Sequence, residues 1–520
     1  MTTGVPDAPR LLRRVRFPGQ GQLFDVALAD GRVTEVRAHT PGSAAGGASA
    51  EGPCADMAGR VLIRGLRDAH AHLVQWAVLR RRLDISGAGS ARETVRAVQE
   101  GAAALPPGEL LTGYGFRDGL WPDAPHKRLL DALPDGRPVL LISADLHTAW
   151  LNSAALALLG EGGHPTGVLR EDASLRATAR LSGVPVPTLD GWVRDACEAA
   201  ARRGVTGVID FECADNVTDW ERRAVSGTPP LRVAAAVYPE HLDAALARGL
   251  RTGTPLGPPG SLLETGPLKL FTDGSLNTRT ALCHDPYPGF GAGDPEAYGL
   301  AQTVGEELVA ALRRAADHGF VPAVHAIGDR ANQLALDAFE QAGCADRIGG
   351  AGRVGCAGRI GCAGRIEHGQ LVRAEDFGRF AELGITVGVQ PTHAVDDRDV
   401  ADQHWPGRTA RAFAYADLLA AGARLEFGSD APVAPLDPWR GIANAVARTD
   451  DDRPAWHPEQ RLTVAQALTA STGGRFAVRA GDPADLAVLD ADPLTSDDAT
   501  LRRLPVHGTL LAGAWSHREN

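Results

Sequence analysis

Leu66-Arg67-Asp68-Ala69-His70-Ala71-His72-Leu73 is the stretch of sequence that decides the fold, and the apolar run Val61-Leu62-Ile63 leads into it. The run predicts a buried strand over Val61–Leu66. Residues two apart on an extended chain point to the same side, so His70 and His72 are expected to aim both imidazoles at one point. A transition metal favours two such nitrogens at a strand end. Chance alone gives about 0.5 His-x-His pairs in a chain with this many histidines, so the pair needs further ligands to support it.

The composition narrows the class of protein. A length of 520 residues suggests about three domains, although a barrel can exceed that prior as one unit. The net charge of −11 argues against nucleic acid as the main partner. We find no signal peptide in residues 1–17 and no run of about 20 apolar residues that could cross a membrane. Seven Cys without a Cys-x-x-Cys motif are typical of reduced thiols. We therefore expect a cytoplasmic protein that acts on a small molecule. Its oligomeric state is open, with a homodimer as one option.

Strand-like apolar runs alternate with helical patterns along the middle of the chain, which predicts βα units and a parallel sheet. Eight such units favour an α/β fold with a (β/α)₈ barrel. A doubly wound open sheet is the alternative, but it does not explain why polar residues recur at so many strand ends. The candidate strands are Val61–Leu66, Val205–Phe211, Leu231–Val237, Leu268–Thr272, Val321–Ala326, Arg365–Glu367, Ile385–Gln390 and Leu425–Phe427.

Two further parts surround the predicted barrel, which spans residues 61–475. Short strands with turns between them fill both ends of the chain, so we expect residues 1–60 and 476–520 to build one small β-domain. The gap after the first strand is too long for one helix. It contains the strand-like Pro138–Ser143 and the helix-like Trp150–Leu159. We expect residues 85–190 to form an α+β insertion over the mouth of the barrel.

A six-residue unit repeats in tandem from Gly350 to Ile366. Its segment Gly350–Gly355 matches the dinucleotide-binding pattern G-x-G-x-x-G, but it follows a helix rather than a strand, and no helix opens after it. The period is also too short for a solenoid. We interpret the segment as an expanded loop before the sixth strand, on the face of the barrel away from the chemistry.

The last polar residues of five candidate strands have side chains that can bind metals. Parallel strands of a barrel end at one face, where such folds place their sites, so these side chains are expected to converge. Their convergence is far more specific than any one of them. They are His70 and His72 after the first strand, Lys269 on the fourth, His325 on the fifth, His368 on the sixth and Asp430 after the eighth.

Each of these residues has a plainer explanation when it is taken alone. A single His after an apolar strand is more often a packed, hydrogen-bonded residue, and Asp430 before Ala-Pro could be a turn residue. Lys269 is harder to explain, because an ammonium between two Leu loses its hydration. The chain otherwise uses Arg for positive charge, and Arg cannot be deprotonated whereas a buried Lys can. A neutral Lys amine can add CO₂ and become a carbamate, which is an anionic bridge between two cations.

The motifs together resemble the amidohydrolase superfamily, in particular its YtcJ-like branch, which includes N-substituted formamide deformylases. The resemblance covers almost the whole chain, and its motifs are very specific for the branch. It implies a (β/α)₈ barrel, a flanking β-sandwich made from both termini, and a divalent metal centre that usually holds zinc. It rests on Asp68–His72, Gly113–Phe116 with Trp121-Pro122, Asp145–Ser153, Thr166–Glu171, Lys269–Ser275, His325–Arg330, Glu367-His368 and Gly428–Pro432.

The resemblance also implies the ligands of the metal centre. We expect two zinc ions, with carboxylated Lys269 and a hydroxide between them. The first ion would be held by His70, His72 and Asp430, and the second by His325 and His368.

The expected reaction is hydrolysis of a non-peptide C–N bond in an amide or formamide. The metal-activated hydroxide would attack the carbonyl, and Asp430 would pass the proton to the leaving amine. Tyr114, Trp121 and His147 in the insertion are candidates for substrate binding, although buried residues that only fix the insertion are an equal explanation. Aromatic residues hint at an apolar pocket, but core packing explains them equally well.

Three features depart from the family pattern. The turn before the first motif reads Arg64-Gly65-Leu66-Arg67 instead of Pro-Gly and an apolar pair, the stretch from Asn152 to Glu171 is short, and the tandem repeat has no counterpart. Two other functions stay open. One is a deaminase or cyclic-amidine hydrolase with a single metal, which the presence of Lys269 argues against. The other is a binding protein that kept the barrel without catalysis, which the complete set of six ligands argues against.

Overall fold

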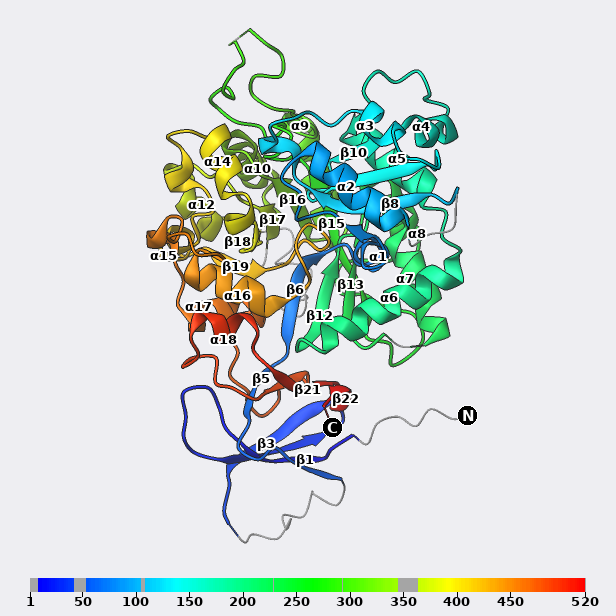
Figure 1. Ribbon diagram of the computed structural model, residues 1–520. Coiled ribbons are helices and arrows are strands. Elements are labelled where there is room, and N and C mark those ends of the chain that lie inside the picture. The colour runs from blue at the N-terminus through cyan, green and yellow to red at the C-terminus, as the bar shows by residue number, and fades with distance from the viewer. Residues whose placement is uncertain are drawn as a thin grey trace.

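A nearly closed barrel of eight parallel strands forms the centre of the computed structural model, which describes residues 8–41, 53–103, 108–227, 229–291, 293–344 and 363–519 (Figure 1). Each strand pairs in parallel with its neighbours in the barrel sheet. The predicted α/β fold with a (β/α)₈ barrel is confirmed. In barrel order the strands are β6 Leu66–Ala71, β12 Val205–Asp210, β13 Arg232–Val237, β15 Leu263–Phe271, β16 Pro322–Ala326, β17 Gly364–His368, β18 Ile385–Val389 and β19 Arg424–Phe427.

The seam between β19 and β6 closes the barrel through the loop that follows β19. The backbone N–H of Asp430 donates to the carbonyl of His70 over 2.7 Å, and the N–H of His72 donates to the carbonyl of Ala431 over 2.7 Å. Gly428 makes this approach possible, because a Cβ at that position would lie 2.6 Å from the backbone nitrogen of His70. The seam therefore places the His-x-His motif directly beside Asp430.

The apolar run and the His-x-His motif belong to two strands, which corrects the predicted first strand Val61–Leu66. β5, Val61–Arg64, pairs antiparallel with β20, Leu486–Leu489, outside the barrel. The run is apolar throughout because β5 is buried on both faces. Leu62 lies in the core of the terminal sheets, and Ile63 lies in the core around the barrel.

Helices connect the barrel strands and cover the outside of the barrel (Figure 1). In α9, for example, Leu308, Leu312 and Ala315 are buried, which is the spacing that one helix face requires. Outside the insertion and the C-terminal sheet, the described helices after β6 are α1 Leu73–Leu79, α6 Val186–Ala201, α7 Asn216–Ser226, α8 Pro239–Ala247, α9 Gly305–Asp317, α10 Asp329–Ala342, α12 Phe377–Glu382, α13 His393–Asp396, α14 Arg398–His404, α15 Tyr415–Ala420, α16 Pro438–Ala447 and α17 Val464–Ser471. The two-residue strand β14 Pro255–Leu256 adds to the edge of β15.

Two four-stranded sheets from the ends of the chain pack below the barrel in Figure 1. Their orders are β3-β2-β1-β4 and β22-β21-β20-β5. They share one apolar core, in which Val26 and Ala55 of the first sheet meet Leu486 and Leu510 of the second. Their further strands are β1 Leu11–Val15, β2 Phe24–Ala29, β3 Arg32–Ala38, β4 Cys54–Asp56, β21 Val506–Leu511 and β22 Ala514–Arg518. The helix α18, Asp498–Arg502, lies between β20 and β21 in the chain and packs on α16.

A separate five-stranded sheet lies across the opposite end of the barrel (Figure 1). Alternate residues of its strand β9 pack into two different cores, Leu141 into one and Ile142 into the other. The helix expected over Trp150–Leu159 begins only at Ser153, because Thr148–Leu151 forms the strand β10 and Asn152 caps the helix. The elements are β7 Leu83–Asp84, α2 Ala91–Ala102, β8 Leu111–Phe116, α3 Lys127–Asp131, β9 Val139–Ser143, β10 Thr148–Leu151, α4 Ser153–Leu159, β11 Val168–Arg170 and α5 Asp172–Ser182.

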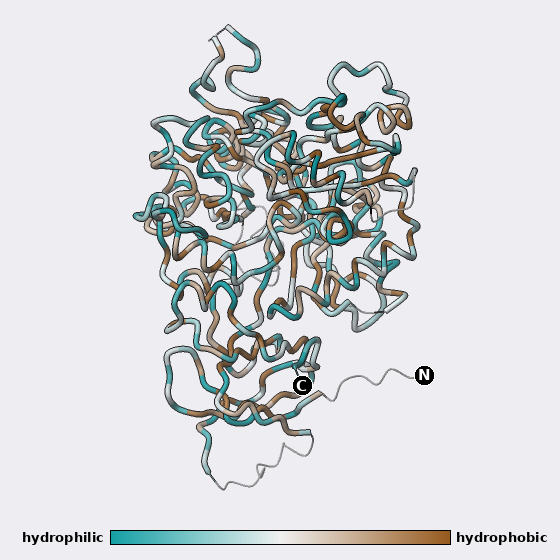
Figure 2. Tube along the Cα trace, in the orientation of Figure 1, coloured by the Kyte–Doolittle hydropathy of each residue, from teal (hydrophilic) through white to brown (hydrophobic). Residues whose placement is uncertain are grey.

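Apolar segments concentrate in the strands and polar ones in the outer loops, as Figure 2 shows. None of the described helices combines the length and the apolar character that crossing a bilayer requires. The domain bounds inferred from the sequence stay a prediction. Residues 350–362 of the tandem repeat lie outside the described residues.

Candidate metal centre

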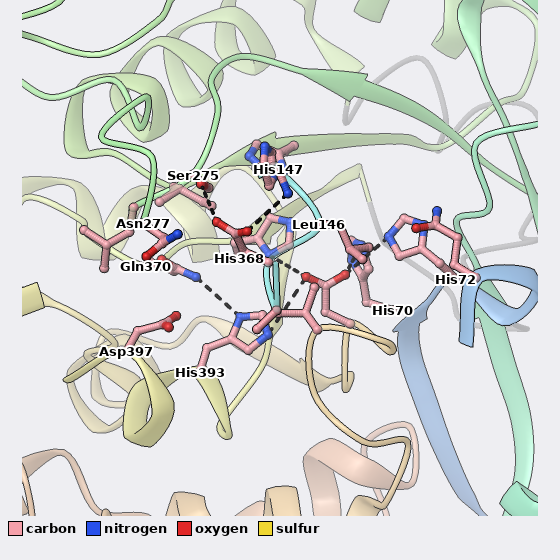
Figure 3. A pocket seen from close by; sticks show the side chains of 18 of the residues that line it. His70, His72, Leu146, His147, Ser275, Asn277, His368, Gln370, His393 and Asp397 are labelled. Atoms are coloured by element: carbon pink, nitrogen blue, oxygen red, sulfur yellow. Dashed lines mark hydrogen bonds and ion pairs between the residues drawn. The ribbon is translucent and has the colours of Figure 1, made fainter. Parts of the chain in front are cut away.

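A cavity of about 140 Å³ opens at the carboxyl ends of the barrel strands. Five of the six predicted ligand positions come from β6, β15, β16 and β17 or follow them directly, and the sixth, Asp430, follows β19. All six line this cavity, together with the loop after β9 and part of the segment after β18. Figure 3 shows His70, His72 and His368 around the same pocket.

One carboxylate and two imidazoles converge at the seam of the barrel. Asp430 Oδ1 lies 3.5 Å from His70 Nε2 and 3.3 Å from His72 Nε2. Two atoms bound at about 2.0–2.1 Å to one tetrahedral ion lie roughly 3.4 Å apart. The three residues also form a group whose candidate ligand atoms all lie within 4.8 Å of one another. Their spacing therefore fits a single divalent cation.

The hydrogen bonds of three imidazoles determine which ring nitrogen is free to bind a metal. His70 donates from Nδ1 to a Glu367 oxygen over 2.8 Å, and His325 donates from Nε2 to the Gly274 carbonyl over 3.2 Å. His368 donates from Nδ1 to Gln390 Oε1 over 3.0 Å, and the amide of Gln390 is oriented by its own donation to a backbone carbonyl. Each ring thus keeps one nitrogen unprotonated. A metal-ligating His almost always has such an outer partner for its other nitrogen.

Burial keeps these three rings in the neutral form that binds cations. Together with the nearby Lys269, it lowers the pKa of His70 to about 4 and that of His325 to about 3. The pKa of His368 lies well below its usual value because of burial and the neighbouring His325. Burial raises the pKa of Asp430, but the surrounding histidines outweigh it and hold that pKa well below the usual range. These three rings therefore offer neutral imidazoles beside a charged carboxylate. Burial also lowers the pKa of His72, but the hydrogen bond to Asp430 outweighs burial and raises that pKa well above its usual value.

Lys269 lies under this cluster with almost no exposed surface. Its Nζ is 3.5 Å from His70 Nε2 and sits above the rings of Phe211 and Phe271, at 4.6 and 5.2 Å from their centroids. Burial lowers the pKa of Lys269 to about 8. A larger fraction of its amine is therefore neutral near physiological pH than in an exposed lysine.

A further histidine of the cavity, His393, was missed by the sequence analysis. His393 follows β18, its Nε2 lies 4.0 Å from Asp430 Oδ2, and that nitrogen is buried without a hydrogen-bond partner among the described residues. His368, His393 and Asp430 form a second group that could hold a cation. The segment Gln390-Pro391-Thr392-His393 contained a signal, because these polar residues follow a strand as the other ligands do. The donor set of the whole cavity fits divalent metal ions.

Two buried carboxylates hold the loops that carry the ligands. Asp68 Oδ1 accepts from the backbone N–H of His70 over 3.1 Å and of Ser429 over 3.0 Å, so it ties β6 to the loop after β19. Asp273 accepts from the backbone of Leu282, Ile327 and Gly328. Burial raises the pKa of Asp68 to about 6 and that of Asp273 to about 7.

The comparison with known families agrees with this site. A model described as the amidohydrolase family matches residues 54–517. The chain belongs to the amidohydrolase family. The Bacillus subtilis protein YtcJ, named as an amidohydrolase, is 30% identical over 501 residues, which are 88% of each chain. The N-substituted formamide deformylase of Arthrobacter pascens is 26% identical over 538 residues, which are 94% of each chain. These relatives confirm the branch that the motifs indicated.

A solved structure shares the fold. It is a metal-dependent hydrolase of Pyrococcus horikoshii, which superposes with a TM-score of 0.72 at 24% identity and covers 94% of this chain and 99% of its own. The family supports an enzyme that acts on carbon–nitrogen bonds.

The three predicted substrate-binding residues of this amidohydrolase-family chain lie in different places. His147 lines the cavity, whereas Tyr114 and Trp121 are not among the lining residues. The hydroxyl of Tyr114 donates to the carbonyl of Ala144 over 2.8 Å. Trp121 packs on Phe116, with their ring centroids 5.5 Å apart. These two aromatics therefore support the cavity wall from behind.

His147 is held firmly in that wall. Its Nδ1 donates to Glu171 over 2.6 Å, and the second oxygen of Glu171 accepts from Thr278 and Thr280 over 2.9 Å each. Burial lowers the pKa of His147, but the hydrogen bond to Glu171 outweighs burial and raises that pKa to about 9. His147 is therefore a charged donor at neutral pH.

Proposed function

We propose that this chain is a metal-dependent hydrolase that cleaves an amide- or formamide-like C–N bond in a small molecule. The observation that carries the proposal is the convergence of Asp430 with His70 and His72 at spacings that fit one cation, inside a cavity. Family membership and the similarity to an N-substituted formamide deformylase support the bond type.

The proposed centre contains two ions, for which zinc is our choice because imidazole and carboxylate donors suit it. His70, His72 and Asp430 would hold one ion, and His325 and His368 the other. Lys269, as a carbamate, would bridge them; its amine lies 3.5 Å from His70 Nε2. Bound divalent ions supply water of lowered pKa and polarise a carbonyl oxygen.

Asp430 is the proposed proton carrier. Its Oδ1 faces His70 and His72, while Oδ2 points towards the part of the cavity near His393. The second oxygen is therefore placed to take a proton from the attacking water and to return it to the leaving nitrogen. Such a general acid–base contributes roughly 10²–10⁴ in rate.

The cavity supports a compact and partly apolar substrate. Phe116, Leu146, Leu276, Ile327 and Val433 line it beside the polar cluster. A cavity of about 140 Å³ is too small for a folded protein or a long polymer to enter. His147 would donate a hydrogen bond to an oxygen of the substrate from the wall that the insertion forms.

The test is a panel of formamides, N-acyl amines and ring amides, with amine and ammonia release measured separately. We expect amine release from at least one formamide or amide. The matched control is Asp430→Asn, which keeps an oxygen that can ligate but cannot carry the proton. It should retain most of its metal while turnover falls by roughly 10²–10⁴.

Two results would contradict the proposal. Ammonia release from ring amidines, with no amine release from any amide, would indicate a deaminase instead. Turnover of metal-loaded Asp430→Asn at the native rate would show that Asp430 only binds the metal.

A further inference from the structure

A buried ion triad lies inside the barrel below the candidate ligands. Arg365 of β17 has no exposed surface, and it donates from Nε to Glu367 over 2.6 Å and from Nη1 to Glu426 of β19 over 2.5 Å. Glu367 is likewise fully buried, and Glu426 is 5% exposed. Nothing in the proposed chemistry uses these three side chains.

The triad connects to the metal centre through one hydrogen bond. Glu367 Oε1 accepts from Arg365 Nε, and the other oxygen, Oε2, accepts from Nδ1 of His70 over 2.8 Å and from Arg365 Nη2 over 3.5 Å. The chain of contacts therefore runs from Glu426 through Arg365 and Glu367 to His70. Because a carboxylate can only accept, this contact fixes the proton of His70 on Nδ1 and leaves Nε2 free towards Asp430.

Stability is a weak explanation for a buried ion triad. Desolvation of buried charges often cancels their attraction, so apolar side chains of similar volume are commonly as stabilising. The neighbouring strand nevertheless leaves room for the carboxylate. A Cβ on Gly388 of β18 would lie 2.0 Å from Glu367 Oε2 and 2.9 Å from an Arg365 nitrogen. The packing is thus built around the charged pair.

We propose that Glu367 is a positioning residue that sets the tautomer of His70 and strengthens it as a metal ligand, and that Arg365 and Glu426 hold Glu367 in place. The negative charge of Glu367 increases electron density on the imidazole, so His70 Nε2 binds a cation more tightly. The inference rests on the proposed function, since it needs a metal at His70.

The test compares two isosteric variants of the same triad. Glu367→Gln removes the charge that faces His70, whereas Glu426→Gln removes the other ion pair of Arg365 without touching His70. Affinity for Zn²⁺ is measured by competition with a chelating dye, without substrate. Outer-sphere partners of ligating histidines are typically worth 10–100-fold in metal affinity. We expect a loss of that size for Glu367→Gln and a loss well under tenfold for Glu426→Gln.

A second readout separates positioning from folding. Both variants should lose similar thermal stability, but only Glu367→Gln should change the visible spectrum of the Co²⁺-loaded protein. If Glu367→Gln does not fold, Glu367→Asp replaces it in the test, because the shorter Asp side chain cannot reach His70 while it pairs with Arg365.

Equal losses of metal affinity in the variants at 367 and 426, or native metal affinity in the variant at 367, would overturn the proposal. Since no substrate is involved, an inactive wild-type enzyme would leave this measurement valid.

Discussion

At the scale of single residues, the two carboxylate oxygens of Asp430 face ring nitrogens of different histidines. Oδ1 faces His70 and His72 at 3.5 and 3.3 Å, and Oδ2 faces His368 and His393 at 3.9 and 4.0 Å. One carboxylate therefore contacts ligand candidates from three separate parts of the barrel. That position explains how one side chain could both bind a metal and remain available to a proton.

The second lysine of the sequence provides a control for Lys269. Lys269→Arg keeps a positive charge, but a guanidinium cannot form the carbamate that we propose as a bridge. We expect this variant to lose activity and about one metal ion per chain, measured by amine release and elemental analysis. Lys127→Arg should retain both, because Lys127 only donates to the carbonyl of His164 in the insertion. Native activity in Lys269→Arg would exclude the bridge.

Residue type and spacing predicted which side chains converge, but not how each one is used. His70 and His72 could be paired from the sequence because a two-residue spacing on a strand fixes their direction. His393 was missed because it comes two residues beyond a Pro, where no regular spacing operates. Tyr114 had the right chemistry for substrate binding, yet its hydroxyl turns to the Ala144 carbonyl. Glu367 was recognised only as part of a motif, because its partner His70 is 297 positions away.

At the scale of elements, the barrel could be predicted because several of its strands, β12, β13, β16 and β18, are separate and mainly apolar runs. The first strand was placed wrongly, since β5 and β6 follow each other with only Gly65 between them. The helix start at Ser153 was also misplaced, because strand pairing of Trp150 with Leu141 outweighs its local helical pattern. Such boundaries depend on which strands pair with each other, and a single sequence does not show which distant segments pair.

Gly428 tests whether the seam of the barrel controls the metal centre. In Gly428→Ala the new Cβ would meet the backbone of His70, so β19 and β6 must separate. We expect a destabilisation of about 1–3 kcal/mol, as for other overpacked sites, together with loss of bound metal. Thermal unfolding and elemental analysis measure the two effects.

The control for this element is Gly441→Ala. Gly441 lies in α16, and apart from the adjacent backbone of its own helix no described atom lies within 4 Å of the position that its Cβ would take. Replacing a helical Gly by Ala should stabilise by roughly 0.5–1 kcal/mol and leave the metal in place. Native stability and metal content in Gly428→Ala would show that the seam can open without affecting the site.

At the scale of the whole molecule, bound metal should stabilise the folded state. The candidate ligands come from β6, β15, β16 and β17 and from the loop after β19, so bound ions would link strands from residue 66 to residue 430 of the chain. A ligand that binds only the folded state stabilises it by RT ln(1 + [L]/Kd), about 2.7 kcal/mol at 100 times Kd.

Removing the metal with a chelator should therefore lower the Tm by several degrees, and added Zn²⁺ should restore the Tm in proportion to the logarithm of the Zn²⁺ concentration. The same shift is expected in His147→Ala, because His147 lines the cavity without belonging to the ligand set. In His70→Ala the shift should largely disappear. The prediction would be contradicted if stripped and loaded wild-type protein had equal Tm values while elemental analysis verified that the metal was bound. The ions would then bind a site that stays formed after the barrel strands have separated.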